Sequence, residues 1–340
     1  MDTLKIEIVN KVGLIKLNRP DSLNALTYEM IQKIEQTLDN WVTESIDFII
    51  LEASGDRAFC AGGDIADLYK SGLEKNYKYS QLFWSDEYRL NKKIANFPKP
   101  IISFLQGFTM GGGVGLGCHV SHRIVSESSK IAMPECGIGL IPDVGGSFIL
   151  AKAPVGIGEY LATTGYRMDA DDAIFSGFSD YFIPQSDWKE VKAKLINSRS
   201  ISVLDEFIKD PPIGKLRGTL EEISSIFSNA SLRSIIDNLE KRSSTFSTQT
   251  LKLIEKNSPL SVLCTFEIIK ILRKKENLTI KDSLEYEYRF TYRAIECSDF
   301  IEGIRAQVID KDRNPNWQHN HIRNVPREKV KTMLKPLNYN

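Results

Sequence analysis

Two carboxylates and a cluster of glycines lie within one forty-residue stretch, from Gly107 to Gly146. Glu135 and Asp143 each follow a proline directly. Three successive glycines, Gly111 to Gly113, would weaken a helix or strand unless some group must approach the backbone closely. The stretch therefore predicts an active site in which carboxylates act as acid, base or nucleophile and backbone amides donate hydrogen bonds.

Backbone amides suit acyl transfer in particular. Cleavage of an ester or thioester develops an oxyanion, and two convergent amides stabilise it without having to ionise. The FCAGGD loop, with Gly62 and Gly63, and the turn at Gly112 could supply one amide each. The alternative interpretation is that these glycines only permit tight packing.

Each carboxylate also has a structural interpretation. Glu135 is surrounded by apolar residues, which predicts a raised pKa and reactivity, but it could instead be a buried structural acid that accepts backbone amides. Asp143 precedes a predicted helix and could be its N-cap. Glu87 falls on the apolar stripe of a predicted helix, where it either sits at the partly exposed edge or accepts a substrate hydroxyl.

Other kinds of catalytic group are disfavoured by spacing. The chain has no G-x-G-x-x-G, no phosphate loop and no G-x-S-x-G, which disfavours nicotinamide cofactors, nucleotide hydrolysis and a serine nucleophile. Cys60 and Cys136 have no histidine plainly beside them, so we interpret them as small apolar residues of the core. No metal site is predicted from the four histidines, which are His119, His122, His319 and His321.

Strands alternate with helices through the first 185 residues, which predicts an α/β architecture. A helix capped by Thr27 and a longer helix over 79–97 separate the strands. From Trp188 to about Ala306 the pattern is helical. We therefore predict a core with the active site over residues 1–187 and a mainly α-helical region over 188–340. The predicted strands are 6–9, 14–17, 48–51, 101–105, 123–125 and 130–132.

The composition limits the classes of binding partner and the compartment that we expect. Lys plus Arg and Asp plus Glu number 44 each, so no basic excess points to nucleic acid or to an anionic membrane. Five cysteines without a C-x-x-C pair favour a reducing compartment. The first residues show neither a signal nor a transit peptide, so we expect a cytoplasmic protein, or a mitochondrial matrix protein whose presequence was removed.

Five motifs lie along nearly the whole chain: LNRPDSLNAL, AFCAGGDI, GFTMGGGVGLG, MPECGIGLIPDVGG and EYEYRFTYRAIECSDFIEGIRAQVIDKDRNPNW. They resemble the crotonase (enoyl-CoA hydratase/isomerase) superfamily, and within it the 3-hydroxyisobutyryl-CoA hydrolases. The similarity implies a ClpP-like core of ββα repeats wound as a spiral, followed by an α-helical C-terminal region.

The resemblance also implies roles for single residues. The N–H groups of Gly63 and Gly112 match an oxyanion hole for the thioester carbonyl, and Glu135 and Asp143 match catalytic carboxylates that also contact the substrate. Glu87 matches a substrate-contacting position. The loop from Asp21 to Leu23 and the carbonyl of Ala61 match the groups that hold CoA.

One departure from relatives helps to choose the reaction. Hydratases of the superfamily use two glutamates, and the first would stand at Gly115, which has no side chain. We therefore expect hydrolysis of 3-hydroxyisobutyryl-CoA, with 3-hydroxypropionyl-CoA as a second substrate, in valine breakdown and without a cofactor or metal. The alternatives are an enoyl-CoA isomerase or hydratase, or a non-catalytic ribosome-associated homologue. Relatives often form trimers, so a homo-oligomer is expected.

Overall fold

The computed structural model of the chain describes residues 2–228 and 231–337, which form two compact units. The first unit takes its described residues from Met1–Asp64, Arg89–Ala132 and Arg167–Arg217. The second takes them from Ile65–Tyr88, Met133–Tyr166 and Gly218–Asn340. The chain thus passes between the units several times. The predicted division after residue 187 separates strand-bearing from helical sequence, and it stays a prediction.

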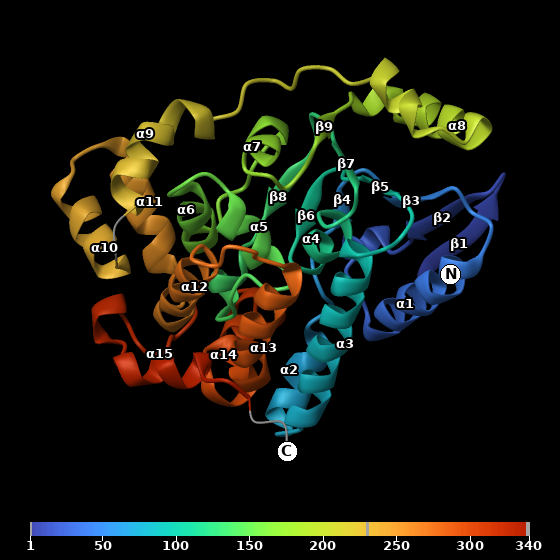
Figure 1. Cartoon of the computed structure of the whole chain (residues 1–340). Helices are drawn as coiled ribbons and strands as arrows, with labels where there is room; N and C mark the ends of the chain where they lie inside the picture. Colours follow the sequence, from blue (N-terminus) through green and yellow to red (C-terminus); the bar gives the residue numbers. More distant parts are fainter. Residues whose placement is uncertain (1, 229–230, 338–340) are drawn as a thin grey trace. The chain divides into compact units, whose positions relative to one another are not determined.

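The first unit holds a six-stranded sheet in the order β1-β2-β3-β5-β7-β9 (Figure 1). Its first two strands form an antiparallel hairpin whose turn residues, Asn10 and Lys11, both have positive φ, as a two-residue turn between twisted strands requires. The remaining strands are parallel to β2 and to one another. The bounds are β1 Leu4–Val9, β2 Val12–Leu17, β3 Phe48–Ala53, β5 Ile101–Phe104, β7 His122–Val125 and β9 Tyr181–Phe182.

A second, smaller sheet of three parallel strands has the order β4-β6-β8. In each of the consecutive pairs β3–β4, β5–β6 and β7–β8, the first strand belongs to the larger sheet and the second to the smaller one. A helical segment follows each pair. This repetition confirms the predicted ββα architecture. The bounds are β4 Ala58–Cys60, β6 Phe108–Met110 and β8 Lys130–Ala132. The sequence did not predict β4 and β6, which are three residues long, nor β9 of the larger sheet, which has two residues.

Helices cover the larger sheet of the first unit. The side chain of Thr27 accepts a hydrogen bond from the N–H of Met30, which confirms the predicted cap of α1 (Tyr28–Thr43). On β2, a Cβ at Gly13 would lie 2.5 Å from the ring of Trp41, so α1 packs tightly there. Trp188, at the start of α8 (Trp188–Ser198), packs edge-on against Phe104. Two shorter helices of this unit are α4 Gly112–Gly117 and α7 Ala170–Phe175.

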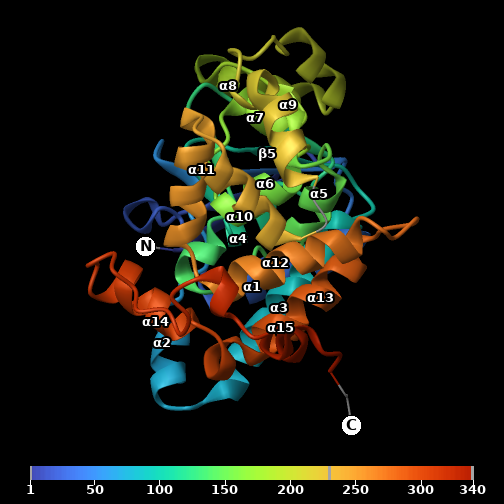
Figure 2. The same ribbon diagram turned by 90° about the vertical axis from the view of Figure 1, so that its left-hand side faces the viewer.

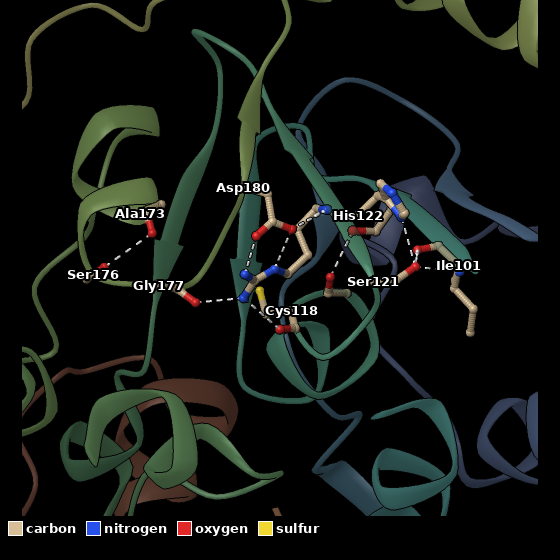
Figure 3. Close-up of polar contacts among 11 residues, drawn as sticks. Ile101, Cys118, Ser121, His122, Ala173, Ser176, Gly177 and Asp180 are labelled. Atoms are coloured by element: carbon tan, nitrogen blue, oxygen red, sulfur yellow. Dashed lines mark hydrogen bonds and ion pairs between the residues drawn. The ribbon is translucent and has the colours of Figure 1, made fainter. Parts of the chain in front are cut away.

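Polar side chains fix β7 between its neighbours. The hydroxyl of Ser121 bonds to both the N–H and the C=O of Ile101, at 2.9 and 3.0 Å (Figure 3). The Arg123 guanidinium donates to the Asp180 carboxylate and to the carbonyl of Gly177, just before β9. These contacts hold the register of the strands from which the glycine turn and β8 emerge.

The second unit is almost entirely helical. Its central helix, α12, carries buried apolar residues around most of its surface and contacts α5, α6 and α13. Figures 1 and 2 both show α12 and α13 side by side. The helices are α2 Ala66–Leu73, α5 Gly146–Lys152, α6 Ile157–Thr164, α10 Leu232–Lys241, α11 Thr245–Lys256, α12 Pro259–Leu272, α13 Ile280–Cys297, α14 Phe300–Ile304 and α15 Arg327–Leu334.

Two further helices, α3 (Tyr77–Ala95) and α9 (Leu216–Phe227), each run from one unit into the other. A capping box of Thr279 and Asp282 begins α13, and the side chain of Ser258 caps α12. Across residues 2–228 and 231–337, no helix combines the length and the apolar character that crossing a bilayer would need.

Candidate active site

Glu135 begins a short 3-10 turn, Glu135–Ile138, directly after Pro134. Its side chain is buried, and within the described chain its Oε2 atom has no hydrogen-bond partner. Burial raises the pKa of Glu135 well above its usual range, and repulsion from Asp143, and less from Glu287 and Glu87, raises it further. A structural acid would be hydrogen-bonded at both oxygens. The free oxygen therefore favours the reactive interpretation of Glu135.

Asp143 lies in the turn that leads into α5, and its carboxyl is buried. The hydroxyl of Tyr88 donates a hydrogen bond of 2.8 Å to its Oδ2 atom. Burial raises the pKa of Asp143 from 3.8 to about 7, although the Tyr88 hydrogen bond lowers it. The alternative in which Asp143 caps the next helix is wrong, because α5 begins after Gly145 and receives no side-chain cap at its N-terminus from that position.

Glu287 of α13 binds the start of α5 from outside the helix. Its carboxylate accepts the N–H of Gly145 at 2.8 Å and the N–H and hydroxyl of Ser147 at 3.1 and 2.5 Å. These donors are amides that the first turn of a helix leaves without internal partners. Burial nevertheless raises the pKa of Glu287 from 4.5 to about 8. Glu287 thus ties the turn that carries Asp143 to the C-terminal region.

Glu87 is 3% exposed, so the prediction that it sits on the buried stripe of α3 is confirmed and the exposed-edge alternative is wrong. Its Oε1 atom finds no partner among the described residues. Burial and repulsion from Asp143 raise the pKa of Glu87 well above its usual range. A buried carboxyl oxygen without a partner costs free energy, which a substrate hydroxyl donor would offset.

The predicted backbone donors and CoA-binding positions lie in the first unit. The N–H of Ala61 donates to the carbonyl of Leu23, whose φ of 51° is left-handed, so these two positions are held together. The N–H of Leu26 donates to Gly62, and the N–H of Asp64 donates to Leu26. Since this pairing uses the neighbours of Gly63, the N–H of Gly63 points to the opposite side of the chain.

Gly112 is the first residue of α4, where a helix leaves its N–H without an internal acceptor. The next residue packs on β4: a Cβ at Gly113 would lie 2.2 Å from the carbonyl oxygen of Cys60. Gly62, with φ +124°, adopts a conformation that side-chain-bearing residues rarely take. Tight packing and a special backbone conformation therefore both apply, while donation by Gly63 and Gly112 stays a prediction.

The structure thus brings Glu135, Asp143 and Glu87 into one electrostatically coupled group within the second unit. Gly63, Gly112, Ala61 and Leu23 belong to the first unit. Sequence reasoning missed Tyr88 and Glu287. Glu287 had a usable signal, because it lies on the apolar stripe of α13, as Glu87 does on α3.

Cys60 and Cys136, interpreted from the sequence as small apolar residues, are core residues. Both are buried, and burial raises the pKa of the Cys136 thiol to about 12. A thiol with such a pKa is protonated at neutral pH and is a poor nucleophile. The carboxyl groups are therefore the reactive candidates.

A family model described as enoyl-CoA hydratase/isomerase matches residues 12–334. The chain is 35% identical over 336 residues to a protein of Danio rerio named 3-hydroxyisobutyryl-CoA hydrolase, mitochondrial, covering 95% of this chain and 87% of that protein. A solved structure titled as an enoyl-CoA hydratase, from Rhodobacter sphaeroides 2.4.1, superposes with a TM-score of 0.94 at 45% identity over 99% of this chain and 98% of that one. Another, titled as a carnitinyl-CoA dehydratase, from Mycobacterium thermoresistibile, has a TM-score of 0.94 at 32% identity over the same shares.

Proposed function

Since this chain belongs to the enoyl-CoA hydratase/isomerase family, we propose that it hydrolyses 3-hydroxyisobutyryl-CoA to the hydroxy acid and CoA. The observation that carries the proposal is the buried group of Glu135, Asp143 and Glu87, three carboxyls with raised pKa values. The similarity to a 3-hydroxyisobutyryl-CoA hydrolase over 95% of this chain supports the same activity.

Hydration of an enoyl-CoA is the competing activity, because two similar solved structures are described as a hydratase and a dehydratase. The composition of α4 argues against it. Gly115 stands where the resemblance to hydratases would put the first of their two glutamates, and a glycine has no side chain to polarise a water molecule. Asp143 is present instead, and its pKa of about 7 allows it both to take a proton from water and to give one up near neutral pH.

In the proposed reaction, the Glu135 carboxylate attacks the thioester carbonyl carbon, and the carbon–sulfur bond breaks to leave an acyl-enzyme anhydride. The departing thiolate takes a proton from Asp143. Water then attacks the anhydride and gives its proton to Asp143, which regenerates the Glu135 carboxylate and releases the hydroxy acid. Direct attack by a water that Glu135 deprotonates is the alternative route.

The other predicted residues act around this step. Glu87 accepts the hydrogen bond of the 3-hydroxyl and so selects hydroxyacyl chains. The N–H groups of Gly63 and Gly112 stabilise the oxyanion, a contribution of roughly 100- to 1000-fold in turnover for each donor. Leu23 and Ala61 hold CoA. The thioester is already activated, so the proposed reaction uses no metal or cofactor.

The substrate, pathway, assembly and compartment of the reaction are part of the same proposal. The substrate is a small acyl-CoA, in valine breakdown as the resemblance implies, with 3-hydroxypropionyl-CoA as a second substrate. We propose that neither nucleic acid nor a membrane takes part and that the protein forms a homo-oligomer. A reducing compartment is proposed: the cytoplasm, or the mitochondrial matrix, since the similar Danio rerio protein is named as mitochondrial.

Thiol release over a panel of acyl-CoA esters tests this function. We expect release of free CoA from 3-hydroxyisobutyryl-CoA and 3-hydroxypropionyl-CoA, with little loss of the enoyl chromophore from crotonyl-CoA. Rapid loss of that chromophore without thiol release would establish the hydratase alternative instead. Co-sedimentation with ribosomes in the absence of either activity would favour the non-catalytic one.

A further inference from the structure

Tyr88 follows Glu87 on α3, and its side chain is buried. Its hydroxyl oxygen lies 2.8 Å from Oδ2 of Asp143 and 3.3 Å from the hydroxyl oxygen of Thr291 on α13. A phenol has one proton, and an ionised carboxylate can only accept. Tyr88 therefore donates to Asp143, and its oxygen is left to accept from Thr291.

The charges around Asp143 make this donor important. Carboxyl groups face Asp143 from three elements: Glu87 from α3, Glu135 from its 3-10 turn and Glu287 from α13. In the part of the chain that the structure describes, no lysine or arginine forms an ion pair with Asp143. The hydroxyl of Tyr88 is thus a main stabiliser of negative charge at this position.

On the function proposed above, we infer that Tyr88 is a positioning residue that fixes the Asp143 carboxyl by one oxygen and stabilises its ionised form, with Thr291 orienting the Tyr88 hydroxyl. The proposed reaction needs Asp143 both to give a proton to sulfur and to take one from water. Both steps are possible at neutral pH when the pKa of Asp143 is about 7. Without the Tyr88 hydrogen bond, burial would keep Asp143 protonated, and the water step would slow.

A purely structural role for Tyr88 can be separated from this one. Its ring packs edge-on against Tyr288, and Tyr88→Phe keeps that ring while removing only the oxygen. Tyr288 offers a matched control, because its hydroxyl donates to the backbone carbonyl of Gln81 and not to a carboxylate. Tyr288→Phe removes a neighbouring hydroxyl without touching the Thr291–Tyr88–Asp143 series.

The direct test follows the carbonyl carbon of aspartate side chains by NMR across pH, in protein labelled at that carbon, with Asp143 assigned from Asp143→Asn. A hydrogen bond to a charged group predicts that Tyr88→Phe raises the Asp143 midpoint by about one to two pH units. Thr291→Val should raise it less, Thr291→Ser should restore it, and Tyr288→Phe should leave it unchanged. If Tyr88→Phe does not fold, Thr291→Val and Thr291→Ser decide the question.

Kinetics give a second, independent measurement. The wild-type Asp143, with a pKa of about 7, is about half ionised at pH 7, and a midpoint raised by one to two pH units lowers that ionised fraction. The kcat for thiol release at pH 7 should therefore fall roughly 5- to 50-fold in Tyr88→Phe, with KM nearly unchanged. An unmoved NMR midpoint in Tyr88→Phe, or equal shifts in Tyr288→Phe, would overturn the inference. If the midpoint rises in Tyr88→Phe but the wild-type protein releases no thiol, the role of Tyr88 is upheld and the proposed function is refuted.

Discussion

Substitution of Gly113 by alanine tests how α4 is seated on β4. The added Cβ would lie 2.2 Å from the carbonyl oxygen of Cys60 and 3.0 Å from its carbonyl carbon. Ordinary contact begins at 3.4 Å, and backbone atoms cannot rotate away, so the helix and the strand must separate by about 1 Å. Gly112, the proposed oxyanion donor, directly precedes Gly113 and begins the same helix. Its N–H group is therefore displaced when the helix moves.

Two effects follow from that displacement. Overpacking should lower the free energy of unfolding by about 1–3 kcal/mol. A misplacement of about 1 Å in a group that stabilises the transition state should lower turnover by roughly 100-fold. Denaturant unfolding measures the first effect, and thiol release from 3-hydroxyisobutyryl-CoA measures the second.

Gly218 provides the matched control for this substitution. It is exposed on α9, and an added Cβ would meet nothing within 4 Å. Gly218→Ala should therefore stabilise the protein by about 0.5–1 kcal/mol through helix propensity and leave turnover unchanged. If Gly113→Ala kept both the stability and the turnover of the wild type, the packing argument for the glycine turn would be refuted.

Three further predictions concern the buried carboxyls. Attack by Glu135 requires its ionised form, and its pKa is raised, so kcat/KM should increase with pH through a midpoint above 4.5; a flat profile from pH 5 upward would contradict this. Glu87→Gln should lower kcat/KM for 3-hydroxyisobutyryl-CoA about 10- to 100-fold and for isobutyryl-CoA far less, whereas equal losses would exclude a contact with the hydroxyl. Glu287→Gln must point its amide NH2 at one of the donors Gly145 and Ser147, which should destabilise the fold by about 1–3 kcal/mol. The pKa of Glu287 rises from 4.5 to about 8 on folding, so the free energy of unfolding of the wild type decreases as pH increases over that range. The difference in stability between the wild type and Glu287→Gln should therefore narrow from about pH 5 to about pH 8. Denaturant curves that show a wider difference at the higher pH would contradict the assignment.

Local patterns predicted much of the fold. Alternation and 3.6-residue periodicity predicted the strands of the larger sheet except β9, and the main helices, and the cap at Thr27 has the predicted hydrogen bond. The strands β4, β6 and β9 were not predicted, because two or three residues are too few to show an alternating pattern. Their pairing partners lie in other repeats, so only the assembled sheet reveals them.

The candidate site divides in the same way. Glu135, Asp143 and Glu87 were predicted because each is a charge in an apolar context, which is visible in a short window. The capping alternative for Asp143 failed because Glu287, more than 140 residues away, supplies the acceptor at the start of α5. The hydrogen bond from Tyr88 to Asp143 spans 55 positions, and a tyrosine on a helix stripe shows no sign of it in sequence.

Thiol release from 3-hydroxyisobutyryl-CoA, measured side by side for the wild type and for Glu135→Gln, tests the central claim most directly. The proposed mechanism predicts steady turnover by the wild type and a loss of at least roughly 100-fold in the variant, which keeps the shape of the side chain but lacks the nucleophilic carboxylate. Near-normal release by Glu135→Gln, or no release by the wild type, would contradict it.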